Sequence, residues 1–468
     1  MATQARRATH EGVIGSLFTA PPTSGHGPVP SAPRLSITLD ALPRTAHSVQ
    51  THTPPTGDAS TAGAVLEPTT PSITSASSLR LICAIAGSEG FITHQWPVVF
   101  AQLGPLPSDE PVELYRAPPP ADQTLFRLVK PMLGSPSSTT LWLRLITSHL
   151  LHLGYTPLTL DPGVFHMTAD ALGSPQTVLV SLHVDCVCAM ASHSGDGSLL
   201  DLLATSLSAV DYVSDMSPVH TLLGIDFDDS SGNTIVLRQR SYISSLVAHH
   251  RCALSSFSSR PPLTPADEHA STGLAAHVAA ALATTAANET YLTLFQSIVT
   301  SLTRCADGAR PDVAYATGML TRCFHCPTPS RLGDAYRVLR YLETGLDTGI
   351  TYSRTQSPLA GMSDSDWSTG RSTTGWAFLY ANASILWGTV AQPSIALSTC
   401  EAELMALSSA GDAAVLLGKR LQAVGRRSPS PIPLPLDHKA SRALSYNPVH
   451  PANPQPLLPP PFPIHLTH

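Results

Sequence analysis

The chain is poor in charged residues and especially in lysine. Of its 468 residues 13% are charged, three are lysine, and the formal net charge is −6 at pH 7. Proteins that hold nucleic acid by bulk electrostatics present a basic field to the phosphate backbone. The composition therefore argues against binding of nucleic acid through overall charge, and it leaves local basic patches as the alternative.

Long apolar runs are also missing from the sequence. No stretch reaches the roughly 20 apolar residues of a membrane-spanning helix. The apolar stretch that follows Arg6 and Arg7 is too short for a secretory signal. We therefore expect an intracellular protein, cytoplasmic or nuclear, with no membrane partner.

The eight cysteines do not form the framework of a short secreted domain, which favours reduced thiols. Cys323 and Cys326 enclose Phe324 and His325 with the spacing of a zinc motif. No second Cys/His pair lies nearby in the sequence, however. The alternative interpretation is a helix end followed by Pro327, and we prefer it.

Proline and apolar residues are distributed unevenly along the chain. The 43 prolines and 30 glycines stand beside 43% hydrophobic residues, so globular parts should alternate with open ones. A domain typically takes about 100–200 residues, which leaves room for two or three. The shifts in composition predict a disordered tail over 1–78, an α+β region over 79–255, a linker and helical region over 256–346, a further α/β region over 359–447 and a Pro-rich disordered tail over 448–468.

Two apolar runs in the first structured region predict a β-hairpin. Residues 178–184 are apolar and rich in β-branched side chains, and a second run over 187–190 follows Asp185 and Cys186. This pattern is typical of a strand, a tight turn and a returning strand. Asp185 would then point from the hairpin tip into the cleft that the sheet lines. Upstream, residues 141–153 predict a helix.

The last quarter of the chain predicts a sheet followed by a long helix. Strand patterns cover 359–363, 375–380 and 384–387. Ser398 and Glu401 have the spacing of a capping box at the start of the helix. Structure should begin near Leu79 in the first region and at about Leu359 in this one.

Three separated carboxylates of this last quarter predict a metal site. Helical periodicity places Glu403 on the buried side of the long helix, beneath the sheet that carries Asp364. Asp437 follows a later apolar segment. Three acids brought together can bind Mg²⁺, because magnesium prefers hard oxygen ligands. The alternative for each acid alone is a solvated strand end.

Short motifs recur in a defined order along the chain. They are Leu79-Arg80-Leu81-Ile82, Glu113-Leu114-Tyr115, residues 127–134, Leu153-Gly154-Tyr155, His183-Val184-Asp185-Cys186, Leu223-Gly224-Ile225-Asp226, residues 239–243, Arg310-Pro311-Asp312-Val313-Ala314-Tyr315, Arg340-Tyr341-Leu342, Ser372-Thr373-Thr374-Gly375-Trp376, Trp387 and the acidic series. This order resembles the pol polyprotein of copia-type long-terminal-repeat retrotransposons, in which a reverse transcriptase precedes a ribonuclease H. The resemblance covers roughly residues 79–450.

The resemblance implies an α+β fold with two enzymatic parts. It implies a partial reverse-transcriptase palm/thumb-like domain, with fingers and palm over 79–255 and a linker with helical thumb or connection over 256–346. A ribonuclease H-like α/β domain over 359–447 follows. The implied partners are an RNA/DNA hybrid or single-stranded nucleic acid, and the implied cofactor is Mg²⁺.

Reverse transcription in this family uses two neighbouring aspartates and a third from an upstream motif, which together hold two Mg²⁺ ions. Asp185 matches the first of these. The second position is Cys186, a soft and neutral side chain, and the upstream position matches Pro97, which has no carboxylate. We therefore expect polymerase activity to be lost.

The resemblance places Asp364, Glu403 and Asp437 at the metal-ligand positions of ribonuclease H. The segment before Asp437 contains three prolines, which remove ladder donors from an expected strand, and His438 stands where the family has Asn. The fourth family acid is missing, and Gly388-Thr389-Val390-Ala391 lacks the lysine pair that is common there. We expect hybrid cleavage to be weak or lost. A non-catalytic nucleic-acid- or partner-binding module, and a relic without selected activity, remain as alternatives.

Overall fold

In this computed structural model residues 72–435 are described, apart from breaks at 100–102, 104–113, 117–124, 128–135, 172, 211, 215, 230–233, 256–261, 267–288, 326, 356, 368–369 and 427–431. The Ala-rich part of the expected linker and both predicted tails, except residues 72–78, lie outside the described residues. No helix in the described part is long and apolar enough to cross a membrane.

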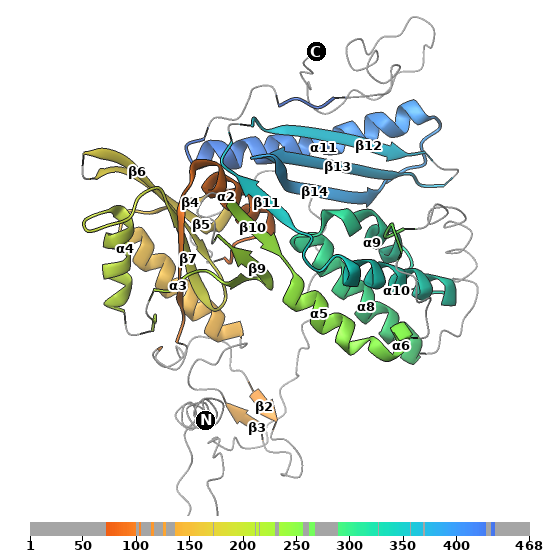
Figure 1. Ribbon diagram of the computed structural model, residues 1–468, viewed down its shortest axis with the longest axis horizontal. Coiled ribbons are helices and arrows are strands. Elements are labelled where there is room, and N and C mark those ends of the chain that lie inside the picture. The colour runs from red at the N-terminus through yellow and green to blue at the C-terminus, as the bar shows by residue number, and fades with distance from the viewer. Residues whose placement is uncertain are drawn as a thin grey trace, which may run out of the picture.

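The described strands form four antiparallel sheets (Figure 1). In the order in which they pair, the strands are β1 (Ile92–Pro97), β7 (Cys186–Ala191), β6 (Ser174–Leu182), β5 (Asp161–Ala171) and β4 (Thr156–Leu158); then β11 (Ile350–Ser353), β10 (Thr234–Arg238), β9 (Ile225–Asp228) and β8 (Thr221–Leu222); then β12 (Ala360–Asp366), β13 (Thr373–Tyr380) and β14 (Ala383–Ala391); and finally β2 (Leu114–Arg116) with β3 (Leu125–Arg127). With the helices, they confirm the predicted α+β class.

The helices cover the sheets and also form a bundle of their own. They are α2 (Ala76–Glu89), α3 (Pro136–His152), α4 (Leu199–Ser208), α5 (Arg240–His249), α6 (Arg251–Ser255), α8 (Glu289–Gly308), the 3₁₀ helix η2 (Pro311–Val313), α9 (Ala314–Thr321), α10 (Pro329–Thr344) and α11 (Thr399–Ala423). Helix α11 lies along the three-stranded sheet, and α5, α6, α8, α9 and α10 gather beside that sheet (Figure 1). The predicted helix over 141–153 and the three predicted strands after residue 359 are present with somewhat longer bounds.

The second half of strand β6, residues 178–182, is buried on both faces, which explains its mostly apolar sequence. Val178 and Val180 face a core shared with α3 and α4, which includes Trp142. Leu179 faces a second core that contains α2. A third core lies within the bundle of α5, α6, α8, α9 and α10.

The segment before α2 was expected to be disordered up to residue 78, and this boundary is wrong for residues 72–78. Thr74 donates from its backbone N to the Leu182 carbonyl at 2.8 Å, and its Oγ1 donates to the Gly163 carbonyl at 2.8 Å. Ser75 caps α2 by accepting the Ser78 N–H. The Ser/Thr-rich sequence thus supplies hydrogen bonds to carbonyls of β5 and β6 and to the start of α2, where Ser and Thr are favoured as caps.

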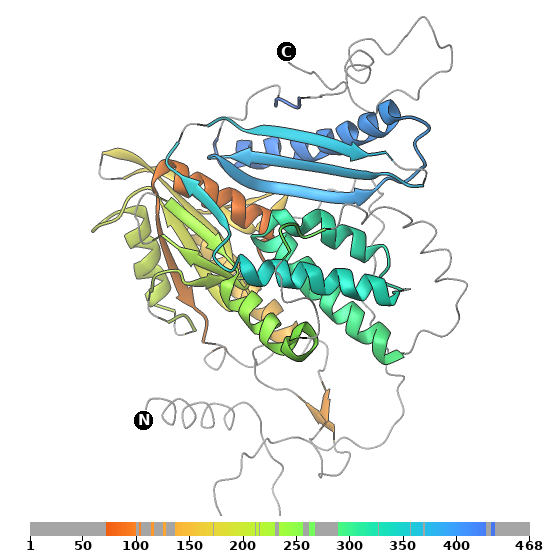
Figure 2. The ribbon, with the colours of Figure 1, turned by 45° about the vertical axis from the view of Figure 1, so that its right-hand side comes forward.

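Helix α2 lies between the five- and four-stranded sheets on one side and the three-stranded sheet on the other (Figure 2). Gly87 allows the close approach, because a Cβ there would lie 2.8 Å from Tyr352 Cβ and 2.9 Å from the Tyr352 carbonyl oxygen. The second core runs without interruption from Leu79 on α2 to Leu417 on α11. The predicted regions 79–255 and 359–447 therefore share one hydrophobic core.

Arg80 is the buried cation at this junction. Its Nε donates to the Ile385 carbonyl at 3.0 Å, and its Nη1 donates to the carbonyls of Asp307 and, at 2.9 Å, Gly308. The guanidinium carbon lies 4.0 Å from the ring centroid of Trp387. Burial lowers the pKa of Arg80 to about 10, so the side chain stays charged at neutral pH. A cation suits this place because Asp307 and Gly308 end helix α8.

Replacing Arg80 with Met should lower the free energy of unfolding by about 3 kcal/mol or more, because three buried carbonyls lose a charged donor. Equilibrium urea denaturation of the full chain measures the change. The matched control is Arg240→Met, since Arg240 and its partner Asp347 have side chains 60% and 71% exposed. Its loss should cost less than about 1 kcal/mol. Equal losses in the two variants would contradict the role given to Arg80.

Candidate functional site

The predicted hairpin is present, with Asp185 at its tip. Strands β6 and β7 are joined by residues 183–185, and the turn is closed by the His183 N–H, which donates to the Cys186 carbonyl at 2.9 Å. Asp185 is exposed, whereas the Cys186 side chain is only 5% exposed. The carboxylate at the tip is thus accessible to solvent.

Pro97 lies directly beside this tip. It is the last residue of β1 and pairs with Cys186 across the antiparallel ladder. The next residue, Val98, donates its N–H to the Asp185 carbonyl at 2.8 Å. The three positions that the resemblance assigned to the polymerase site are therefore neighbours in space, and together they carry one carboxylate.

The surroundings of Cys186 make its thiol a poor metal ligand. Burial, together with the nearby Asp185 charge, raises the pKa of the Cys186 thiol, so it stays protonated. His183 is also buried, and burial lowers the pKa of its imidazole to about 4. Its Nε2 lies 3.0 Å from Ser181 Oγ. At neutral pH the hairpin therefore offers a neutral imidazole and a neutral thiol beside Asp185.

The second group of predicted residues lies where β12 meets α11. Glu403 is 7% exposed on the face of α11 that contacts the sheet, as predicted. Ser365 Oγ donates to Glu403 Oε1 at 3.1 Å. Because successive strand side chains point to opposite faces, Asp364 lies on the other face from Ser365. Asp364 is exposed, and its Oδ1 accepts the Ser365 N–H at 2.8 Å.

The structure distinguishes Asp364 from its neighbour Asp366. The Asp366 carboxylate accepts the backbone N–H of Thr373, the Thr373 hydroxyl at 2.9 Å and the Tyr315 hydroxyl at 3.3 Å. These donors occupy the oxygens that a metal would need. Asp364 is therefore the better candidate ligand of the two.

The proline-rich segment before Asp437 does not form a strand in its described part, residues 432–435. It contacts the edge of β12 through a carbonyl, since the Gly361 N–H donates to the Pro433 carbonyl at 3.0 Å. A proline residue can accept in this way but cannot donate. Asp437 and His438 lie outside the described residues. Among the residues that are described, no three His, Cys, Asp or Glu side chains gather as a metal site.

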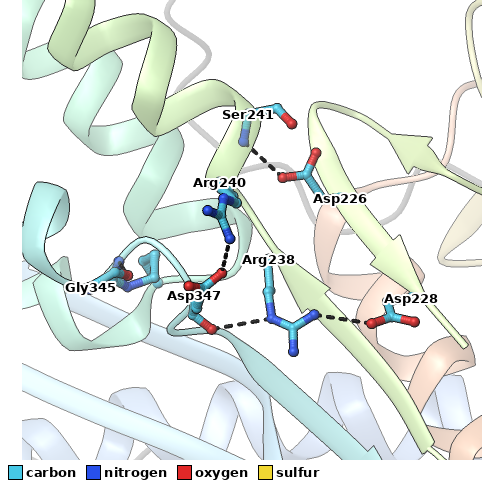
Figure 3. A network of polar contacts seen from close by, with 8 residues as sticks. Asp226, Asp228, Arg238, Arg240, Ser241, Gly345 and Asp347 are labelled. Atoms are coloured by element: carbon cyan, nitrogen blue, oxygen red, sulfur yellow. Dashed lines mark hydrogen bonds and ion pairs between the residues drawn. The ribbon is translucent and has the colours of Figure 1, made fainter. Parts of the chain in front are cut away.

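Two arginines, the half-buried Arg238 and the exposed Arg240, are held by acids of the chain itself (Figure 3). Arg238 contacts Asp228 at 3.2 Å and donates to the Asp347 carbonyl at 3.2 Å, while Arg240 contacts the Asp347 carboxylate at 2.6 Å. Asp226 accepts the backbone N–H of Ser241 at 2.9 Å. The network ties the β9–β10 hairpin and the start of α5 to the loop before β11, and it reduces the positive charge that this surface presents.

Sequence reasoning did not predict the contacts of Ser365 with Glu403 or of Asp366 with Tyr315. Local patterns contain no signal for them, because each joins segments that are distant in the chain. Trp367 is a further example. Its Nε1 donates to the Ala396 carbonyl at 3.2 Å, which fixes a side chain that is 49% exposed near the start of α11.

Residues 57–261 match the family described as reverse transcriptase (RNA-dependent DNA polymerase). Secreted RxLR effector protein 161 of Plasmopara viticola is 38% identical over 116 residues, which make up 24% of this chain and 82% of that protein. The Retrovirus-related Pol polyprotein from transposon RE1 of Arabidopsis thaliana is 25% identical over 383 residues, or 80% of this chain. The match spans 24% of that polyprotein's length.

A solved structure of the foamy viral protease-reverse transcriptase in complex with an RNA/DNA hybrid aligns with a TM-score of 0.38 and 11% identity. The alignment covers 77% of this chain and 40% of that one. The family match and the transposon relatives agree with the ordered motifs of the sequence. The chain belongs to the reverse transcriptase family of copia-type retrotransposon Pol polyproteins.

Proposed function

We propose that this chain derives from a reverse transcriptase joined to a ribonuclease H, that it no longer polymerises DNA, and that it cleaves an RNA/DNA hybrid slowly or not at all. The pairing of Pro97 with Cys186 beside Asp185 is the observation that carries this proposal. Two-metal phosphoryl transfer needs several hard oxygen ligands in one place. A single carboxylate with a protonated thiol and a pyrrolidine ring does not supply them.

The ribonuclease H-like part is the better candidate for residual chemistry. Asp364, Glu403 and Asp437 are the acids that the resemblance assigns to Mg²⁺ there. Asp364, however, lies on the opposite face of β12 from Ser365 and Glu403, so the described geometry does not bring Asp364 and Glu403 to one ion. When bound, Mg²⁺ would activate a water and stabilise the charge on a phosphodiester. Ser365 holds the buried Glu403 carboxylate beneath the end of β12, and Asp364 presents its carboxylate to solvent.

Two features support slow rather than efficient cleavage. Residues 432–435 contact β12 through the Pro433 carbonyl and form no strand, so this edge of the sheet lacks the rigid support of a paired strand there. Residues 388–391 at the end of β14 include no lysine, and Arg238 and Arg240 are paired within the chain. Fewer free cations weaken the grip on phosphates.

The metal site can be tested by terbium luminescence, because Trp367 lies three residues after Asp364 and can sensitise a bound lanthanide. Asp364→Asn should weaken Tb³⁺ binding by about tenfold or more, since it removes a charged oxygen ligand. The control is Asp170→Asn, which alters an exposed acid on β5. Equal Tb³⁺ affinity in wild type and Asp364→Asn would show that Asp364 is not a metal ligand.

Cleavage should be measured on a labelled RNA/DNA hybrid with Mg²⁺. We expect a rate about 100-fold or more below that of an intact ribonuclease H, because an imprecisely held ligand set costs that much, and no cleavage by Asp364→Asn. Cleavage at the rate of the intact enzyme would contradict the proposal. Salt-dependent binding of the hybrid without cleavage would favour a non-catalytic binding module, and no binding at low salt would favour a relic.

Primer extension tests the polymerase site. The wild-type chain should extend no primer. The variant Pro97→Asp should gain a Mg²⁺- or Mn²⁺-dependent rise in melting temperature, because it places a second carboxylate beside Asp185 and a ligand that binds the folded state stabilises it. Adding Asp185→Asn to that variant should abolish the gain. Extension by the wild type would disprove the loss of polymerase activity.

A further inference from the structure

The three-stranded sheet has an open edge at β12, the strand farthest from the helical bundle (Figure 1). Among the described strands β12 pairs with β13 alone. Backbone N–H groups alternate between the two sides of a strand. The Gly361 N–H points to the open side, where it donates to the Pro433 carbonyl at 3.0 Å. The N–H groups of Ser363 and Ser365 therefore point to the open side as well, and the Ser365 N–H donates there to Asp364 Oδ1 at 2.8 Å.

Residues 432–435, here called the strap, lie against this edge. Leu434 anchors the strap, because it is 7% exposed and belongs to the same core cluster as Phe378 of β13. Gly361 allows the close approach, since a Cβ there would lie 2.5 Å from Leu434 Cδ2. Ile432 is partly buried and packs against the same core. Apolar contacts thus hold the strap on the sheet, together with the hydrogen bond from Gly361 to Pro433.

Prolines prevent the strap from completing the sheet. Pro433 and Pro435 have no N–H, so neither can donate to a β12 carbonyl. The strap accepts a hydrogen bond from Gly361 but forms no strand. Natural sheets commonly use proline and charged side chains to protect an edge from pairing with another chain. The strap therefore covers the start of β12 without presenting a new edge that is rich in donors.

The edge beneath the strap is complementary to itself. Two copies of an edge strand can pair antiparallel about a two-fold axis, and the longest overlap of β12 with a second copy places Ser363 opposite Ser363. Asp364 then lies opposite Met362, and Asp366 lies opposite Ala360, so no acid faces another acid. The next register in one direction would instead place Asp364 opposite Asp364, where like charges repel. The sequence of β12 therefore favours one central register.

Two side chains of β12 lack the contacts that this pairing would provide. Ser363 Oγ is buried and has no hydrogen-bond partner among the residues that the structure describes. Hydroxyl side chains directly opposite each other on paired strands can hydrogen-bond. Met362, on the other face of the strand, is 49% exposed. A second copy would supply a hydroxyl to Ser363 and a neighbouring strand to Met362.

We infer that the edge of β12 is a strand-addition surface for a second copy of this chain, and that the strap keeps this surface closed. The pairing uses the Gly361 N–H, which the Pro433 carbonyl accepts at present, so the strap has to leave before a second copy can add. The surface consists of backbone groups and the side chains of Met362 and Ser363. The inference is thus independent of whether any acid of the chain binds a metal.

Leu434→Ser should release the strap, because it removes the buried apolar anchor. The expected result for the full chain is a dimerisation constant about tenfold or more tighter than in wild type, measured by sedimentation equilibrium. Amide hydrogen exchange in a peptide covering residues 360–366 should also become slower as the protein concentration rises. The matched control is Leu397→Ser, which changes a leucine that is 87% exposed outside the sheet. It should leave dimerisation and exchange as they are in wild type.

Ile432→Asp provides a milder release of the strap, because Ile432 is only partly buried. It should tighten dimerisation in the same direction as Leu434→Ser, and it decides the question if Leu434→Ser does not fold. Circular dichroism and the melting temperature establish which variants are folded.

Substitutions of Met362 in the released background test the register. Met362→Asp would face Asp364 of the second copy at both symmetric positions and should weaken dimerisation by about tenfold, whereas Met362→Lys should tighten it. Ser363→Pro should abolish it, because proline removes an N–H from the open side, a position at which an edge strand tolerates proline.

The inference fails if folded Leu434→Ser and Ile432→Asp dimerise no more tightly than wild type. It also fails if they dimerise more tightly but substitutions of Met362 and Ser363 have no effect, since the copies would then meet through another surface.

Discussion

The buried guanidinium of Arg80 is the constraint on which the rest of the architecture depends. A charge inside an apolar core is costly unless every donor finds an acceptor. Here the acceptors come from the end of α8 and from Ile385 on β14, segments that are far from α2 in the sequence. Trp387 covers the cation and donates its own Nε1 to the Ala306 carbonyl at 2.9 Å. The hydrogen bonds that offset the cost of burying this cation form only when α2, the end of α8 and β14 are all in place. The part that contains α2, the helical bundle and the three-stranded sheet therefore depend on one another.

This interdependence explains how the fold tolerates Pro97 and Cys186 at the positions proposed for the polymerase site. Pro97 ends an edge strand, where its missing N–H leaves no interior ladder unsatisfied. Cys186 is buried and serves as a small apolar side chain in the core that contains α2. Neither residue disturbs packing, although neither can hold magnesium. Replacing an acid in this hairpin can therefore leave the stability of the fold unchanged, because the acids of such a site do not pack in the hydrophobic core.

Sequence patterns predicted what local physics controls. The β6–β7 hairpin with Asp185 at its tip follows from apolar runs, and the start of α11 follows from Ser398, which accepts the Glu401 N–H at 3.2 Å. The capping box itself is incomplete, since Glu401 accepts from Leu397 instead of Ser398. The hydrogen-bonded structure of residues 74–78 was missed because Ser/Thr-rich sequence suits both disorder and caps. The contact of Ser365 with Glu403 could not be predicted, because tertiary packing decides which strand residue faces the helix.

The same distinction bears on how a copia-type chain remains recognisable when its chemistry is proposed to be impaired. Family motifs such as those containing Arg80, Arg310 and Thr373 make contacts across segments, so each substitution there disrupts several partners at once. The acids of a metal site contact few protein groups without the metal, and replacing one relieves like-charge repulsion. When selection acts only on folding, substitutions therefore replace metal-ligand acids before they replace the residues that connect distant segments. On this argument the resemblance records the packing of the ancestral protein, and the test of function lies in the few carboxylates that remain.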